Sequence, residues 1–80
     1  MSQVPVRRSR TEMKFDVLRL LRGGGRNTSR VSGIANLTFR NAFTLLSDLE
    51  RDGLVSREIR MWGITELGRK KLRLYEEALA

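Results

Sequence analysis

The stretch from Val31 to Val55 constrains the fold most, because it holds two helical segments joined by a very short connection. Thr38 is a residue type that caps helix N-termini, and Gly53 is the type that ends helices in a left-handed conformation. About four turns of helix, from Thr38 to Asp52, fit between these signals. One side of this helix is apolar and is expected to be buried. Its members are Phe39, Ala42, Phe43, Leu46 and Leu49.

The opposite side of the same helix is polar, and its N-terminal half carries Arg40, Asn41 and Thr44. In the major groove of DNA, Arg pairs with guanine and Asn with adenine. In a helix-turn-helix, the N-terminal residues of the second helix enter that groove. We therefore expect base readout at these three positions, with Ser47 and Thr38 beside them. The alternative interpretation is an ordinary solvated helix face.

Length and composition favour one small binding domain. Eighty residues bury a limited core, so a partner chain would help stability. Without cysteine or histidine, the chain lacks disulfides, thiolate chemistry, the usual zinc ligand sets and imidazole catalysis. No convergent catalytic set exists, and we expect neither an enzyme nor a cofactor or metal. No apolar run is long enough to cross a bilayer, and no secretion signal is evident, so we expect a cytoplasmic, nucleoid-associated protein.

The net charge of +7 is unevenly placed along the chain. Residues 1–40 hold nine Arg or Lys and two acidic residues, whereas residues 41–80 hold seven of each. A basic half is suited to attract phosphates, although an anionic membrane or an acidic protein would also be attracted. We expect double-stranded DNA as the partner, and neither a membrane nor a small-molecule effector.

Residues 1–8 contain the only proline and show no periodicity, which predicts a flexible basic arm preceding a domain at 9–80. Arg7, Arg8 and Arg10 would contact phosphates or the minor groove. The alternative is a solvated tail.

Ser9 and Glu12 have the spacing of a capping box, which predicts a helix from there to about Arg22, ended by three glycines. The glycines lack the Lys and Ser or Thr of a phosphate-binding P-loop. Phe15 and Leu18 lie outside the expected core stripe, so the apolar arc is wider than one small domain normally covers. The stripe itself consists of Met13, Val17, Leu20 and Leu21.

Asn27 or Thr28 is expected to cap a short helix that runs through about Ala35. Val31, Ile34 and Ala35 would face inward. Ser29 and Arg30 would contact phosphates near the exposed helix start, helped by its free amides.

Two short segments, Leu54 to Glu58 and Met61 to Ile64, are predicted to form a hairpin anchored by Trp62. Arg57 and Arg60 at its tip would reach phosphates beside the groove. The alternative is an irregular connection, because no tight-turn pair such as Asn-Gly separates the two runs.

Thr65 is expected to begin a last helix, about 66–79, whose apolar arc spans roughly 160°. We expect its outer flank and the surplus apolar residues of the first helix to form a twofold homodimer. The alternative is that the two helices cover each other within one chain. The predicted interface residues are Phe15, Leu18, Leu72, Tyr75 and Leu79.

Three short motifs follow one another from Asn36 onward. They are Asn36, Leu37, Thr38 and Phe39, then Gly53, Leu54 and Val55, then Trp62, Ile64, Thr65 and Gly68. With these motifs the chain resembles, over roughly residues 11–75, the winged helix-turn-helix proteins of archaea and of their plasmids and viruses, especially the small chromatin-associated type. The resemblance implies a mainly α fold with three helices, a short β-hairpin wing and a C-terminal dimerisation helix. It also implies double-stranded DNA binding.

Three functions follow from these observations. The first is a transcriptional regulator that reads the major groove with the helix from Thr38 to Asp52. The second is a DNA-packaging protein with little sequence preference, suggested by the diffuse basic half. The third is a protein-docking module, suggested by the apolar excess on the first and last helices. RNA binding is less supported, because the sequence places no exposed aromatic platform.

Overall fold

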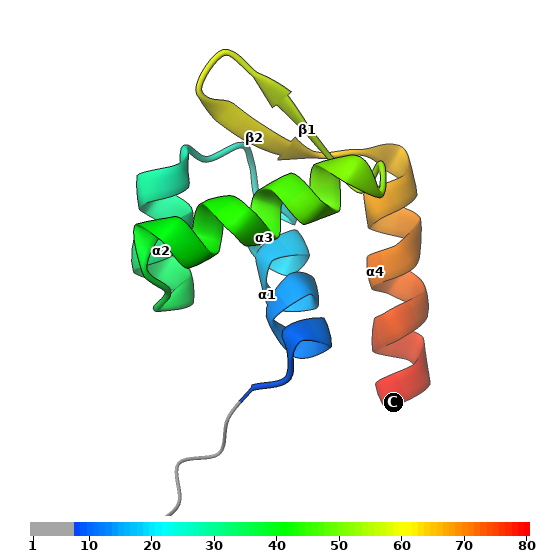
Figure 1. Ribbon diagram of the computed structural model, residues 1–80. Coiled ribbons are helices and arrows are strands. Elements are labelled where there is room, and N and C mark those ends of the chain that lie inside the picture. The colour runs from blue at the N-terminus through cyan, green and yellow to red at the C-terminus, as the bar shows by residue number, and fades with distance from the viewer. Residues whose placement is uncertain (1–7) are drawn as a thin grey trace, which may run out of the picture.

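The computed structural model describes residues 8–80 as four helices and one antiparallel hairpin (Figure 1). Helix α3 crosses in front of α1, α2 lies beside its N-terminal end and α4 lies toward its other end. The hairpin lies above α3 in this view, and its tip points back toward the side of α2. This is the mainly helical winged helix-turn-helix arrangement that the sequence predicts. The elements are α1 (Arg10–Arg22), α2 (Thr28–Ala35), α3 (Phe39–Arg51), β1 (Val55–Glu58), β2 (Met61–Ile64) and α4 (Glu66–Leu79).

Each helix begins at a side-chain cap that the sequence signals. The Ser9 hydroxyl accepts from the Glu12 amide, and the Glu12 carboxylate accepts from the Ser9 amide, which completes the capping box of α1. Asn27, Thr38 and Thr65 cap α2, α3 and α4 in the same way. Because these bonds satisfy first-turn amides, they fix where each helix starts.

The hairpin forms despite its unfavourable turn sequence. Val55 pairs with Ile64 and Glu58 with Met61, which leaves a two-residue loop, Ile59 and Arg60. Ile59 occupies the left-handed region at φ 58°, which a β-branched residue rarely adopts. The predicted hairpin is therefore confirmed over the alternative of an irregular connection, and strand pairing overrides the local turn preference.

Trp62 anchors the hairpin to the helices, as predicted, with only 1% of its surface exposed. Its indole Nε1 donates to the Thr28 hydroxyl at 2.9 Å, and its backbone exchanges two hydrogen bonds with Arg26. These contacts tie the wing to the start of α2. The core around it comprises Val17, Leu18, Leu21, Val31, Ala35, Ala42, Leu45, Leu46, Leu49, Val55 and Leu72.

Helices α1 and α4 pack against each other within one chain, which corrects part of the predicted dimer interface. Leu18 and Leu72 are fully buried in the core. Phe15 and Tyr75 stack in parallel with ring centroids 3.8 Å apart. Leu18 and Leu72 are therefore unavailable to a second copy, and the surplus arc of α1 is covered by α4. Leu79 remains exposed.

The buried side of α3 is rotated from the predicted one. Leu45 is buried, whereas Phe39 and Phe43 are 56% and 39% exposed. On α2, Ile34 is also exposed, at 57%. The predictions that these three face inward are wrong. The reason is that α1 and α2 pack against the side of α3 that contains Leu45, which turns the two aromatic side chains outward.

Candidate nucleic-acid interface

The turn between α2 and α3 sets the angle at which α3 is presented. Asn36 takes the left-handed conformation at φ 56° and ends α2. The Leu37 amide donates to the Ser32 carbonyl at 2.9 Å, and the Ser32 hydroxyl donates to the Leu37 carbonyl at 2.7 Å. Because both polar groups of Leu37 are held by Ser32, the turn is short and fixed.

The outward side of α3 carries the polar edge, which we define as Arg40, Asn41, Thr44 and Ser47. The first three are exposed, and Ser47 is half-buried. At about 100° per residue, Arg40, Thr44 and Ser47 lie opposite the buried side, while Asn41 lies on the flank toward α1. Thr38 differs from them, because its hydroxyl accepts from the Asn41 amide at 3.1 Å as the helix cap.

On the α1 side of the polar edge, Asp48 is neutralised by arginines. Arg10 forms an ion pair with Asp48, and Arg51 approaches the same carboxylate at 3.6 Å. A carboxylate beside a groove-facing helix would repel phosphates if it were unpaired. Arg10, which was predicted to bind phosphate as part of the N-terminal basic cluster, therefore has a carboxylate partner within the protein.

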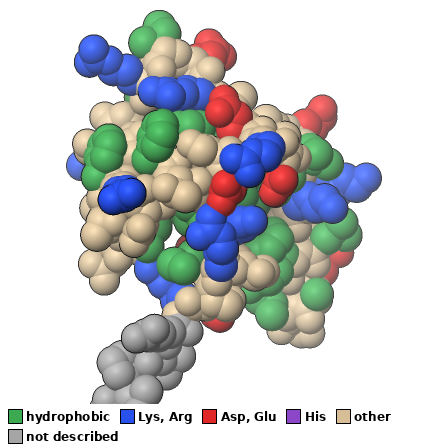
Figure 2. Space-filling model, viewed as in Figure 1, with side chains coloured by type: hydrophobic (Ala, Val, Ile, Leu, Met, Phe, Trp, Pro, Cys, Tyr) green, Lys and Arg blue, Asp and Glu red, His purple; other side chains and the backbone are tan. Residues whose placement is uncertain are grey.

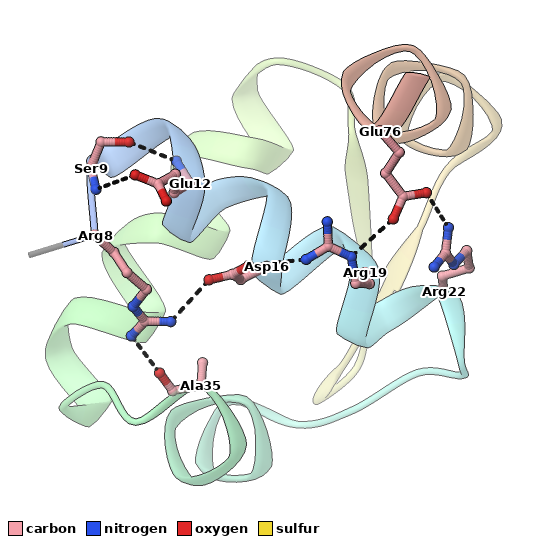
Figure 3. A network of polar contacts seen from close by, with 8 residues as sticks. All are labelled: Arg8, Ser9, Glu12, Asp16, Arg19, Arg22, Ala35 and Glu76. Carbon is pink, nitrogen blue, oxygen red and sulfur yellow. Dashed lines mark hydrogen bonds and ion pairs between the residues drawn. The ribbon is translucent and has the colours of Figure 1, made fainter. Parts of the chain in front are cut away.

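Arg8 also has partners within the domain, which contradicts its assignment to a free arm. Its guanidinium donates to Asp16 at 3.0 Å and to the Ala35 carbonyl at 2.7 Å (Figure 3). The carbonyl belongs to the last turn of α2, where helix carbonyls lack partners within the helix. Arg8 thus links α1 to the end of α2. Arg7 lies outside the described residues.

On the wing side of α3, Arg57 lies between two aromatic rings. Its guanidinium carbon is 5.6 Å from the Phe43 ring centroid and 5.1 Å from that of Trp62. The two rings meet edge to face, with centroids 6.1 Å apart. Cation–π contacts of this kind hold the Arg57 side chain beside α3.

A concavity of about 340 Å³ opens between the starts of α2 and α3 and the wing. The capped N-terminus of α2 borders it, where free amides and the helix dipole favour anions. Arg57 and Arg60 border the other side. Its lining residues are Asn27, Thr28, Ser29, Phe39, Arg57 and Arg60. The structure thus brings Ser29 and both wing arginines, which were predicted separately as phosphate contacts, to one concavity.

The arginines of residues 8–80 differ in whether they form ion pairs. In that range, the ion pairs use Arg8, Arg10, Arg19, Arg22 and Arg51. No ion pair within that range involves the predicted contact residues Arg30, Arg40, Arg57 and Arg60, all of which are exposed. The same is true of a second basic set on α4, which consists of Arg69, Lys70, Lys71 and Arg73. In the view of Figure 2, basic and hydrophobic side chains adjoin on the face that α3 crosses.

A separate polar network holds α1 to α4. Arg22 and Arg19 donate to the two oxygens of Glu76 at 2.8 and 2.9 Å (Figure 3). Hydrogen bonds from Arg22, and next from Arg19, hold the pKa of the Glu76 carboxyl below its usual value. The bond to Glu76 in turn raises the pKa of Arg19. This network stabilises the fold on a side away from the polar edge.

Within residues 8–80, no helix is long and apolar enough to cross a membrane, and no cluster of acidic side chains could hold a metal ion. The aromatic residues on the exposed side of α3 and the Arg26 contact with the wing were missed from the sequence. No local pattern signals either of them, because both depend on which elements pack together.

Comparison with known proteins identifies the fold. The family model described as winged helix-turn-helix matches residues 7–79. The solved structure of wild-type ZitR from Lactococcus lactis is similar, with a TM-score of 0.65 over 98% of this chain at 16% sequence identity. This chain covers 63% of the ZitR chain, which is less than two thirds of its length. A comparison with curated proteins finds no match. Since the family model matches nearly all of its residues, the chain belongs to the winged helix-turn-helix family.

Proposed function

We propose that the protein binds double-stranded DNA as a transcriptional regulator, with the first turns of α3 in the major groove. The observation that carries the proposal is the placement of Arg40 on the outward side of α3, outside any ion pair in residues 8–80. Arg pairs with guanine O6 and N7 through two hydrogen bonds. In this proposal Arg40 reads a guanine, and Asn41, Thr44 and Ser47 contact neighbouring bases.

The start of α2 and the wing are proposed to contact the phosphate backbone beside α3. Arg30 and Ser29 lie at the exposed start of α2, and Arg57 and Arg60 lie on the wing. Phosphate contacts position a protein on the duplex without reading its sequence. Arg8 and Arg10 are left out of this set because carboxylates already neutralise them.

The pairing of several arginines removes one argument for DNA packaging. Packaging was suggested by a diffuse basic half, but several of its arginines are paired with carboxylates on α1, α3 and α4. Within that half, Arg30 on α2 and Arg40 on α3 are outside the ion pairs of residues 8–80. We also propose that the chain is of the small archaeal winged-helix type that its sequence resembles.

We further propose a homodimer formed through the outer side of α4. Leu67, Leu74 and Leu79 are 45%, 49% and 67% exposed, and Leu67 and Leu74 are seven residues apart, so they lie on one helix stripe. A twofold dimer would present two copies of α3 to half-sites about 34 Å apart. Sedimentation equilibrium should give a dimer that Leu74→Glu dissociates. A wild-type protein that is monomeric at tens of micromolar would contradict the proposed homodimer.

The test of DNA reading uses a duplex of about 24 base pairs recovered by selection from a random pool, with a scrambled duplex beside it. Fluorescence anisotropy should show that Arg40→Ala loses about 1–3 kcal/mol on the selected duplex and much less on the scrambled one. Arg30→Ala should weaken both equally and reduce the salt slope by about one.

The control is Arg69→Ala, which removes the same charge from the exposed surface of α4. It should bind both duplexes nearly as wild type does. Equal losses for Arg40→Ala on selected and scrambled DNA would favour packaging. Absence of wild-type binding to any duplex at low salt would overturn the proposal and favour a protein-docking module.

A further inference from the structure

Two of the three phenylalanines of the chain stand on the outward side of α3, one helical turn apart. Phe39 is 56% exposed and Phe43 is 39% exposed. We call them the aromatic pair. An exposed phenylalanine is costly in water, and two adjacent ones mark a surface that a ligand covers. They adjoin the polar edge on the side toward the wing.

Phe43, the less exposed member of the aromatic pair, is held by its surroundings. Phe43 meets the buried Trp62 ring edge to face and carries Arg57 against its own ring. Phe39 lines the concavity beside Ser29, Arg57 and Arg60. An immobilised ring loses little entropy on binding, so such a surface is suited to recognition.

The arginines around the aromatic pair determine which class of ligand can bind there. Arg57 and Arg60 lie on one side, Arg40 follows Phe39 directly in the helix, and all three are outside the ion pairs of residues 8–80. A protein partner that buries an apolar patch inside this border would leave these charges desolvated. A polyanion that also carries apolar groups would neutralise the arginines and cover the phenylalanines. In the major groove of DNA, the apolar group at the base edge is the thymine 5-methyl.

We propose that Phe39 and Phe43 contact thymine methyl groups and so determine sequence preference, an inference that rests on the proposed function. Residues four apart on a helix are about 6 Å apart along its axis. Successive bases of one strand are about 3.4 Å apart. The aromatic pair therefore reaches thymines one or two steps apart, beside the guanine that Arg40 is proposed to read.

The test removes only the methyl groups. The selected duplex is compared with a copy in which deoxyuridine replaces every thymidine, which leaves all hydrogen-bonding groups of the bases in place. For each methyl group that a phenylalanine covers, wild type should bind the deoxyuridine copy about three- to fourfold more weakly. Phe39→Ala and Phe43→Ala should each bind the thymidine duplex more weakly and show a smaller ratio between the two duplexes.

The matched control is Ile34→Ala, which trims an equally exposed apolar side chain from α2. It should keep the wild-type ratio. If Phe43→Ala lowers the unfolding midpoint, the test is read from Phe39→Ala alone. Phe39 is the more exposed of the two, so its removal should disturb the fold less.

The outcomes separate the two proposals. Wild-type binding to both duplexes with equal affinity would overturn the thymine inference and leave the DNA-binding proposal intact. A selected binding site that contains no thymine would also overturn the thymine inference and leave the DNA-binding proposal intact. Failure of wild type to bind either duplex would instead overturn the proposed function.

Discussion

Gly68 shows how a single residue fixes the relation between α4 and the wing. A Cβ at this position would lie 2.1 Å from the Leu54 carbonyl oxygen and 2.8 Å from Ile64 Cγ1. That carbonyl accepts from the Thr65 amide at 3.0 Å, so it is held in place. The start of α4 therefore packs directly on the backbone at the base of the wing.

We predict that Gly68→Ala lowers the free energy of unfolding by about 2–3 kcal/mol, because backbone has to move to admit the methyl group. The matched control is Gly33→Ala, since an added Cβ there meets nothing within 4 Å. It should raise the free energy of unfolding by about 0.5–1 kcal/mol, as expected for replacing glycine inside a helix. Urea unfolding measures both. Equal effects of the two substitutions would show that the close approach at Gly68 is absent.

Single residues also account for what the sequence failed to predict. Ile59 occupies a left-handed turn position that normally takes glycine or asparagine, so the hairpin was predicted from its strands and the turn conformation was not. Phe39, Phe43 and Ile34 are apolar and were expected to be buried, yet all three are exposed. Hydrophobicity identifies what favours burial, and neighbouring elements decide which of those residues are covered.

At the scale of elements, the Arg19–Arg22–Glu76 network couples α1 to α4. The pKa of Glu76 is lower in the folded chain than its ordinary value, so folding is favoured when this carboxyl is ionised. The contribution is present above the unfolded pKa of about 4.3 and is lost as the pH falls through the lower folded pKa.

We therefore predict that Glu76→Gln destabilises the protein at pH 7 and that its deficit relative to wild type is smaller at pH 3. Urea midpoints at the two pH values measure the change. Glu77→Gln removes the adjacent exposed carboxylate and should leave the wild-type midpoint nearly unchanged at both. A Glu76→Gln deficit that is the same at pH 3 as at pH 7 would contradict the role of the ionised carboxylate.

Element boundaries were predictable because they depend on local signals. Ser9 with Glu12, Asn27, Thr38 and Thr65 each cap a helix as expected. The pairing of helix faces was less predictable, since it depends on contacts between distant parts of the chain. The contact of α1 with α4 through Phe15 and Tyr75 satisfies within one chain an apolar excess that the sequence assigned to a dimer.

At the scale of the whole molecule, charge is organised by pairing as well as by position along the chain. Carboxylates neutralise arginines on α1 and at the end of α3, whereas exposed arginines at the start of α2, on the outward side of α3, on the wing and on α4 form no ion pair among residues 8–80. The sequence indicated that the first half is basic. It did not indicate which arginines are paired, because the partners of Arg8, Arg10 and Arg22 are 8, 38 and 54 residues away.

The central claim is that the outward side of α3 faces duplex DNA, and amide chemical-shift mapping by NMR tests it most directly. Titration of ¹⁵N-labelled protein with the selected duplex should shift the amides from Phe39 to Thr44 most, with smaller shifts at the start of α2 and on the wing. The outer side of α4 should change little on binding apart from effects of dimer formation. Shifts concentrated on α4, with the first two turns of α3 unchanged at saturation, would contradict the account.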